Sequence, residues 1–452
     1  MKIIKMKKRR WQNQFIAELL NNYPKIEPKC KHFRLCGGCS FQDFSYQDQL
    51  KVKGEKLRLL VESSKLKVES FKDDTSLMPI FGDQSYQYRT RMDYIVGEKG
   101  IGLRRKHRFD EIEYLDECWL IDDEIYQLCK KVYDEGIRLG LQPYNLHDHT
   151  GYWRYLSVRI NNNGEVMLIL VTADDLKQHE LLERLLDKFS IFPSRDRTAA
   201  GNFQFPMKEE LFNRKIISIY HLINKGLADT NFGEVRKYWG QDKLVFNINE
   251  TKIAIGPNTF FQNNISLFNR LLKKMVDWVD ADDNVLDLYC GVGTLSLPMA
   301  RKVKSVLGVE LNEESVEMAR ENARDNNISN VEFVVGDLDQ VSSFPSRDRA
   351  AADNFQFSIF KKFSISNDTI SKRYNILVVD PPRKGLEKVV DFVRDGGWQK
   401  IIYLSCNPLT LVKDLEILMD KFEIKDVSFW DLYPQTPHVE TLVLLERNGV
   451  VL

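Results

Sequence analysis

The feature that most constrains the fold is a regular alternation of short apolar runs and helical segments that begins near residue 285. Five apolar runs have the composition of buried strands, and segments with helical periodicity, such as 313–326 and 386–394, lie between them. Strands that alternate with helices at this spacing form a mostly parallel, doubly wound α/β sheet. The expected strands cover residues 285–289, 305–310, 331–335, 375–379 and 401–404.

Composition indicates a globular protein of several domains. Of the 452 residues, 43% are apolar and 29% are charged, which is typical of folded soluble proteins. No apolar run reaches the length of about 18 residues that a membrane helix needs, and the N-terminus lacks the apolar stretch of a secretory signal. We therefore expect a cytoplasmic, monomeric protein without membrane segments. The net charge is zero, so charge alone predicts no partner.

One sequence element occurs twice. Residues 192–205 (FPSRDRTAAGNFQF) recur at 344–357 (FPSRDRAAADNFQF) with two differences. A structural repeat carries a whole folding unit and recurs several times, whereas here the similarity stops sharply at both ends. We interpret the element as an insertion that is tolerated as a surface loop, because longer loops cost little additional closure entropy.

Basic and aromatic residues are interleaved between residues 86 and 109. Single-stranded nucleic acid needs this combination, because cations bind phosphates and flat rings stack on bases. The alternative is an ordinary solvated surface. The aromatic residues are Tyr86, Tyr88, Tyr94 and Phe109, and the basic residues are Arg89, Arg91, Lys99, Arg104, Arg105, Lys106 and Arg108.

Three cysteines, Cys30, Cys36 and Cys39, lie within ten residues. The two glycines before Cys39 let the backbone turn tightly enough to direct three thiolates inward. A fourth ligand has to come from elsewhere, with Cys118 the first choice and Cys129 the second. An odd total of seven cysteines without a secretory signal argues against a disulfide framework. The spacing leaves an iron–sulfur cluster, a zinc site and unliganded cysteines open.

A cofactor crevice is expected at the carboxyl edge of the sheet. A Gly-x-Gly turn at 291–293 directly follows the first strand, where a ligand can approach the backbone. Glu310, Asp337 and Asp380 follow three further strands, so their carboxylates point to the same edge. Glu310 stands where a carboxylate accepts hydrogen bonds from ribose hydroxyls. NAD is the competing ligand, but Ser296 occupies the position of the last glycine in the nicotinamide fingerprint.

Two residues near the same edge are candidate reactive groups. Cys406 lies just past a strand and is a candidate nucleophile, although cysteines at strand ends are commonly buried small hydrophobes. Glu440 precedes the terminal strand and is either a base or an exposed acid. The prolines of the segment 380–383 (DPPR) stiffen a loop that can press against a flat base.

Together these segments resemble the RNA 5-methyluridine methyltransferases, which methylate C5 of uracil in RNA with S-adenosylmethionine. The likeness is greatest to the 23S rRNA (uracil-5-)-methyltransferases that carry an iron–sulfur cluster. It extends from Cys30 to Thr441, and the combination of SCNP and HVE after DPPR is specific. The matching segments are CKHFRLCGGC, PNTFFQNN, DLYCGVGTLSL, VLGVELN, VVDPPRKG, YLSCNPLTL and PQTPHVETL.

The resemblance implies roles for eleven residues. Cys406 is the nucleophile that adds to C6 of uracil, and Glu440 is the base that removes the C5 proton. The ligands of a 4Fe–4S cluster are Cys30, Cys36, Cys39 and Cys118. The contacts to S-adenosylmethionine are Gln262, Tyr289, Glu310, Asp337 and Asp380.

The resemblance also implies a domain organisation. The catalytic domain, 251–452, is a Rossmann-like methyltransferase domain that holds the second repeat copy. It follows a basic extension (1–25), an iron–sulfur and RNA-binding region (26–125) and an α+β region (126–250) with the first copy. Only 29 residues precede Cys30, too few for the small RNA-binding barrel of some members. Thr294 stands where several members have Asn beside the cofactor, so it is left out of the expected contacts.

The expected substrate is 23S rRNA, and the alternatives are transfer RNA and a catalytically silent, RNA-binding ribosome assembly factor. An amino-group methyltransferase usually has Asn-Pro-Pro and does not need Cys406. A redox protein built around the cluster is the remaining alternative.

Overall fold

The computed structural model describes residues 19, 21–64, 66, 78–189, 194–195, 214–338 and 373–449. Most of the predicted basic extension and the whole second repeat copy lie outside these residues. Of the first copy only Ser194–Arg195 are described, and they form a short edge strand, β7, where a surface loop was expected. Among the described helices none has the length and hydropathy that a membrane crossing requires.

The C-terminal sheet confirms the predicted α/β pattern. Five strands, β14-β13-β12-β15-β16, run parallel in this spatial order. β18 pairs antiparallel with β16, and β17 pairs antiparallel with β18, so β17 has the same direction as the five parallel strands. β1 pairs parallel with β17 at the far edge. The strands are β1 (Ile80–Phe81), β12 (Asn284–Leu288), β13 (Ser305–Glu310), β14 (Val331–Val335), β15 (Ile376–Val379), β16 (Lys400–Ser405), β17 (Phe422–Trp430) and β18 (Glu440–Arg447).

Helices cover both faces of this sheet because alternate strand residues point to opposite sides. Val285 and Val378 pack with α5, α6 and α7, whereas Leu286 and Val379 pack with η5, α10 and α11. The sheet is therefore doubly wound, as the alternation predicts. These helices are α5 (Ile265–Asp277), α6 (Ser296–Ala300), α7 (Glu313–Asp325), η5 (Glu387–Val389), α10 (Val390–Asp395) and α11 (Pro408–Leu418).

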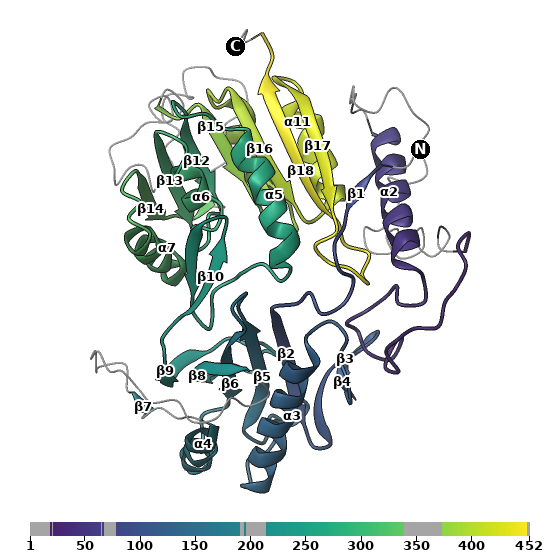
Figure 1. The fold of residues 1–452 in the computed structure, drawn as a ribbon, viewed down its shortest axis with the longest axis vertical. Coiled ribbons are helices and arrows are strands. Elements are labelled where there is room, and N and C mark those ends of the chain that lie inside the picture. Colours follow the sequence, from purple (N-terminus) through teal and green to yellow (C-terminus); the bar gives the residue numbers. More distant parts are fainter. Residues whose placement is uncertain are drawn as a thin grey trace.

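The second sheet lies below the first in Figure 1 and has the order β4-β3-β2-β5-β6-β8-β9-β7. Its pairs are antiparallel except β6·β8. Two helices pack on one face, α3 (Asp123–Arg138) and α4 (Leu176–Phe189). The other strands are β2 (Arg91–Gly97), β3 (Gly100–Arg105), β4 (Arg108–Tyr114), β5 (Trp153–Ile160), β6 (Glu165–Thr172), β8 (Lys215–Ile223) and β9 (Glu234–Gly240).

This arrangement divides the chain differently from the expected boundaries. β2, β3 and β4 come from the expected region 26–125, yet β2 pairs with β5 of the region 126–250. The N-terminal helix α2 (Tyr46–Glu62) and β1 instead pack on the catalytic sheet. Local patterns do not show this division, because it depends on contacts between segments that are far apart in sequence.

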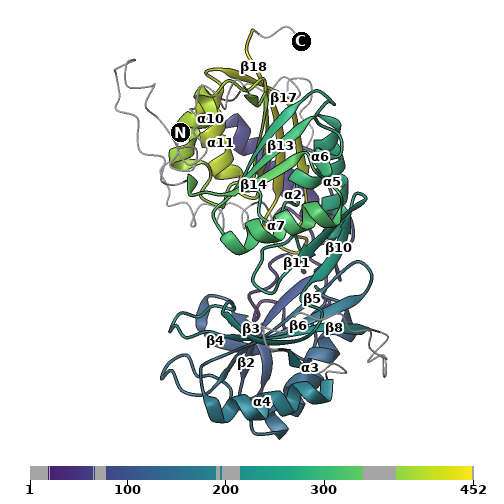
Figure 2. The same ribbon diagram turned by 90° about the vertical axis from the view of Figure 1, so that its left-hand side faces the viewer.

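A hairpin joins the two sheets. It consists of β10 (Leu244–Ile248) and β11 (Thr251–Ile255), which lie between the sheets in Figures 1 and 2. Buried residues of the hairpin belong to one continuous core with Ile169 of the second sheet and Val285 of the first. Asn322 on α7 fixes the hairpin, because its Nδ2 donates to the Ala254 carbonyl at 3.0 Å and its Oδ1 accepts from the Ala254 N–H at 2.8 Å.

We expect Asn322→Ala to destabilise the catalytic domain. The Nδ2 group also donates to the Val292 carbonyl at 3.1 Å, so the substitution leaves three buried backbone groups without partners. An unsatisfied buried group costs about 1–3 kcal/mol, and the expected loss in the free energy of unfolding is roughly 3 kcal/mol. Urea denaturation measures it, with Arg324→Ala on the exposed side of α7 as the control. Equal stability of the two variants contradicts the assignment.

Candidate functional site

A cavity of about 830 Å³ opens at the carboxyl ends of the parallel strands. Its position follows from the topology, since consecutive parallel strands all end at the same edge of the sheet. Side chains from β12, β13, β15, β16 and β18, or from the loops that follow or precede them, meet there. All seven residues expected to be catalytic or to contact the cofactor line it: Gln262, Tyr289, Glu310, Asp337, Asp380, Cys406 and Glu440.

The Glu310 carboxylate is held by the backbone. Its Oε2 accepts from the Gly291 N–H at 3.1 Å, and its Oε1 accepts from the Asn312 N–H at 2.9 Å. Gly291 has a φ of 55°, which glycine adopts without strain. Tyr289, with a φ of 67°, is in the left-handed region where a non-glycine residue is strained, and such residues concentrate at functional sites. The turn therefore fixes one carboxylate at the cavity wall.

Two further carboxyl groups at this edge are buried. Burial raises the pKa of Asp380 to about 7. Burial likewise raises the pKa of Asp287 to about 7, and the nearby Asp380 and Glu310 charges add to the shift. The Ser296 hydroxyl donates to Asp287. Ser296, which replaces the last glycine of the nicotinamide fingerprint, thus donates to one oxygen of a buried acid, Oδ2, while the other oxygen, Oδ1, has no hydrogen-bond partner in the described part of the chain.

Burial favours the uncharged forms of the two candidate reactive groups when nothing is bound. Burial raises the pKa of Cys406 to about 12, with Glu440 and Asp380 adding to the effect. Burial, followed by the Asp380 charge, raises the pKa of Glu440 well above its ordinary value. Arg383 opposes both shifts. The protein therefore holds a thiol and a carboxylic acid in one desolvated space, with a guanidinium beside them.

A hydrogen bond to the backbone of Arg383 fixes the position of this residue. Its carbonyl accepts from Asn407 Nδ2 at 2.8 Å, which ties the loop after β15 to the residue after Cys406. Gly385 follows with a φ of 80°, and a Cβ there would come within 2.6 Å of Asp414 Oδ2. That oxygen also accepts from the Tyr403 hydroxyl at 2.7 Å. The 380–383 loop is thus anchored on α11 and β16, the elements that flank Cys406.

Gln262 lies on the side of the cavity that faces the second sheet. Its carbonyl accepts from Thr90 Oγ1 at 3.1 Å, just before β2. The buried Arg159 of β5 donates to the Pro257 carbonyl at 3.1 Å and to the Thr259 carbonyl at 2.5 Å. The second sheet therefore shapes this wall of the cavity.

Of the lining residues outside the expected set, Arg383 and Tyr433 interact with the candidate reactive groups. Arg383 belongs to the DPPR motif, but its carbonyl contacts and its proximity to Cys406 depend on the fold. Tyr433 follows β17, and burial raises its pKa, with further contributions from Glu440 and Cys406. A signal for Tyr433 was present in the sequence, because it directly precedes the PQTPHVE segment.

The four cysteines expected to bind a cluster line a second, small cavity beside β3 and β4. The Gly38 N–H donates to Cys36 Sγ at 3.3 Å, and Gln42 Nε2 donates to Cys39 Sγ at 3.2 Å. Cys118 completes the set. Cys129, the second choice, is buried in the core under α3 and does not line this cavity. Among the described residues no three or more His, Cys, Asp or Glu side chains are grouped as around a metal ion.

The prediction of a nucleic-acid-binding surface is wrong for two of its aromatic residues, Tyr88 and Tyr94. Tyr94 is fully buried in the core of the second sheet, and Tyr88 is buried with its hydroxyl donating to the Pro434 carbonyl at 3.0 Å. Neither ring can stack on a base. Phe109, at 80% exposure, and the partly exposed Tyr86 remain accessible. Alternation of aromatic and basic residues did not distinguish strand residues that face the core from those that face solvent.

We expect the charges around Cys406 to control its alkylation by iodoacetamide. Because only the thiolate reacts, the rate rises about tenfold per pH unit below the pKa. Where Glu440 is ionised its charge raises the pKa of Cys406, so Glu440→Gln speeds the reaction, whereas Arg383→Gln slows it, each by roughly tenfold for a shift of one pKa unit. Peptide mass spectrometry follows Cys406 separately from the other cysteines.

Arg394→Gln, whose side chain pairs with Asp391 and Asp395 outside the cavity, is the control for this experiment. Identical alkylation rates in all four proteins contradict the electrostatic coupling.

The chain is similar to known proteins over nearly its full length. Residues 235–448 match a family model described as tRNA (Uracil-5-)-methyltransferase. An RNA methyltransferase of Clostridium tetani is 31% identical over 450 residues, covering 96% of this chain and 88% of the relative. A tRNA (uracil(54)-C(5))-methyltransferase of Pyrococcus furiosus is 28% identical over 435 residues, covering 95% and 88%.

A solved structure has the same architecture. The crystal structure of the Pyrococcus abyssi tRNA (uracil-54, C5)-methyltransferase in complex with S-adenosyl-L-homocysteine superposes with a TM-score of 0.65 at 25% identity. The match covers 91% of this chain and 86% of that one. The chain therefore belongs to the family of RNA uracil-C5 methyltransferases.

Proposed function

We propose that this protein transfers a methyl group from S-adenosylmethionine to C5 of a specific uridine in RNA through a covalent Cys406 adduct. The observation that carries the proposal is the single cavity that brings Cys406 and Glu440 together with carboxylates from three other strands. Its volume of about 830 Å³ is in the range of ligand and cofactor sites.

The methyl donor is assigned to the side of the cavity near β12, β13 and β14. Glu310 accepts hydrogen bonds from the ribose hydroxyls, and Asp337 faces the adenine. Gln262, Tyr289 and Asp380 provide the remaining contacts. The backbone bonds that fix Glu310 support this assignment, because a rigid carboxylate binds a diol at a low entropy cost.

The target uracil is assigned to the side near Cys406, and it has to leave its stack to enter. The thiolate of Cys406 adds to C6, and the electron pair of the C5–C6 bond becomes an enolate that makes C5 nucleophilic. C5 then takes the methyl group from the sulfonium, which leaves as neutral S-adenosylhomocysteine. Glu440 removes the C5 proton, the C6–S bond breaks, and the thiolate is restored.

Cys406 and Glu440 both have to be in their charged forms for this reaction. Arg383 lowers the pKa of Cys406 and of Glu440, and is the residue that favours their charged forms. A sulfonium cation beside Asp380 and Glu440 favours their carboxylates in the same way. We therefore infer that the substrate-free protein keeps its nucleophile protonated and that loading the cavity activates it.

The RNA substrate is predicted to be 23S rRNA, on the strength of the cysteine motif. A second candidate, transfer RNA, is favoured by a separate observation, since the Pyrococcus relatives are named as tRNA methyltransferases. The exposed Phe109 and the neighbouring basic residues of β3 and β4 are candidate RNA contacts.

Cys30, Cys36, Cys39 and Cys118 are proposed as ligands of a structural 4Fe–4S cluster. A zinc ion needs four ligands that meet around one point. Among the described residues no side chains are grouped in this way. In a cluster each thiolate binds a different iron, so the sulfurs surround a space instead of meeting at a point. A Cys₄ donor set around one small cavity fits that requirement.

The function is tested with S-adenosylmethionine that carries a labelled methyl group and separate pools of unmodified 23S rRNA and tRNA. We expect label in 5-methyluridine of one pool only. Cys406→Ala should abolish transfer because no other group can activate C5. Glu440→Gln should form the protein–RNA adduct but fail to resolve it, so that a covalent complex accumulates on denaturing gels. Cofactor binding without transfer to either pool supports the assembly factor instead.

The cluster is tested by iron and acid-labile sulfide analysis of protein purified without oxygen. We expect both elements in equal amounts in the unmodified protein and a large loss of both in Cys36→Ala. Cys129→Ala removes a buried thiol that lies outside the cavity, and this variant should keep its iron. Stoichiometric zinc, or iron in Cys36→Ala at the unmodified level, overturns the proposal.

A further inference from the structure

Residues 431–438, in the loop between β17 and β18, contribute to a wall of the candidate active site. This segment carries Tyr433, which lines the cavity, and Val439 joins it to Glu440. The loop has little regular structure of its own, and Gln435 within it has a φ of 65°, which is strained for a non-glycine residue. Contacts from outside the loop therefore have to hold this conformation.

The buried carboxamide of Gln49, on α2, makes the densest of these contacts. Its Oε1 accepts from the Gln435 N–H at 3.1 Å, and its Nε2 donates to Gln435 Oε1 at 2.9 Å. The same Nε2 also donates to the carbonyls of Phe41 and Phe44, both at 3.0 Å. One side chain thus joins the 431–438 loop to the segment that precedes α2.

An ion pair one turn further along α2 holds the start of the loop. Lys53 Nζ lies 2.6 Å from Asp431 Oδ1, and both side chains are almost completely buried. Lys53 Nζ also donates to the Tyr433 carbonyl at 3.3 Å. Because a buried charge without a partner is strongly destabilising, this pair fixes the spacing between α2 and the loop.

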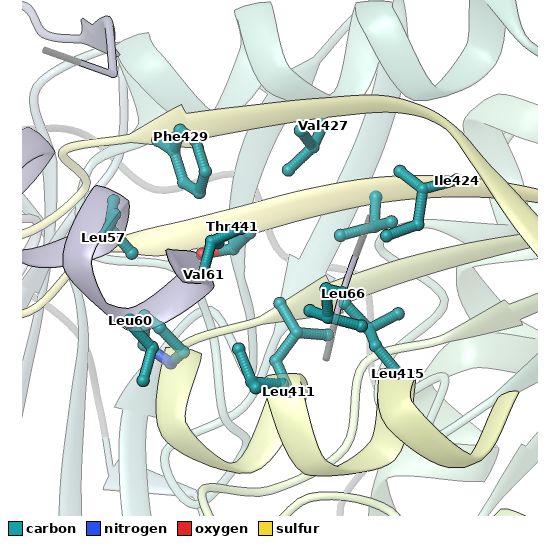
Figure 3. Close-up of a pocket in the computed structure, with 13 residues that line it drawn as sticks. Leu57, Leu60, Val61, Leu66, Leu411, Leu415, Ile424, Val427, Phe429 and Thr441 are labelled. Carbon is teal, nitrogen blue, oxygen red and sulfur yellow. The ribbon is translucent and has the colours of Figure 1, made fainter. Parts of the chain in front are cut away.

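Apolar contacts seat α2 beside the loop. Figure 3 shows Leu57 and Leu60 of α2 facing Phe429 of β17 and Leu411 of α11 around a small apolar pocket. α2 therefore lies firmly on the catalytic sheet. Its polar residues nearer the N-terminus can then act as a rigid support for the 431–438 loop.

The two residues that follow Cys39 contact the same loop. The N–H groups of Ser40 and Phe41 donate to the Gln435 carbonyl at 2.7 and 3.2 Å. Ser40 directly follows Cys39, which lines the small cysteine cavity. The loop of the active site is thus bonded to the chain within one residue of a candidate cluster ligand.

We propose that Gln49 is a positioning residue for the methyl transfer reaction, holding the 431–438 loop so that Tyr433 and Glu440 meet the substrate in the reactive arrangement. This inference rests on the proposed function, in which Glu440 is the base. Gln49 lines neither the catalytic cavity nor the cysteine cavity, so its effect on the reaction is indirect and passes through its contacts with the loop.

The test compares Gln49→Glu with Gln47→Glu in the full-length protein. Both make the same change on the same helix, but Gln47 is exposed. With S-adenosylmethionine and the RNA transcript that accepts label, we expect kcat of Gln49→Glu to fall about 10-fold to 100-fold, as for small misplacements of a catalytic group. The KM for RNA should stay within twofold, and the covalent complex should accumulate as in Glu440→Gln.

A second variant and a second measurement keep the test decisive. Gln49→Met removes the hydrogen bonds without burying a charge, and Gln47→Met is its control. Alkylation of Cys406 needs no RNA, and a displaced loop should make it faster in both Gln49 variants, as in Glu440→Gln.

The possible failures are distinguishable. If Glu440→Gln accumulates no adduct, the assignment of the base in the proposed function fails. If Glu440→Gln does so while folded Gln49 variants keep the kcat and the alkylation rate of their Gln47 controls, the positioning role of Gln49 is overturned.

Discussion

Parallel pairing of the strands β12 to β16 is the constraint on which the rest of the structure depends. Each backbone register sets where a strand ends, and in a parallel sheet those ends lie along one edge. Glu310 and Asp380 are far apart in sequence but become neighbours there. The antiparallel β18 reaches the same edge with its first residue, Glu440, because Thr441 pairs with Ser405. The site is thus assembled by hydrogen bonds that involve none of its side chains.

Burial gives this edge its chemistry. Carboxyl groups and a thiol that are ordinarily solvated are largely surrounded by protein here, so the uncharged forms of Asp380, Glu440 and Cys406 are favoured. Arg383 is the fixed positive charge that opposes this effect. Its backbone is bonded to Asn407, next to Cys406, so the cation and the thiol keep their spacing as one unit.

The sequence predicted local features well and long-range ones poorly. The five expected strands and the helix at 313–326 appear within one or two residues, because apolar periodicity and strand-end motifs are local signals. The same motifs placed seven candidate residues at one cavity. The packing of α2 on the catalytic sheet, the burial of Tyr88 and Tyr94, and the approach of Tyr433 depend on contacts between segments that are far apart in sequence. No periodicity within a window of a few turns carries that information.

The bond between Gln49 and the 431–438 loop joins residues 386 positions apart, and this separation has a consequence for how the protein matures. During translation α2 emerges early, but the loop that it supports follows roughly 20 to 80 seconds later at ordinary elongation rates. Over that interval its buried amide and ammonium groups lack their partners. A nascent or truncated chain can therefore complete its second sheet while the catalytic edge stays unassembled, and the active site is completed only when the 431–438 loop has been made.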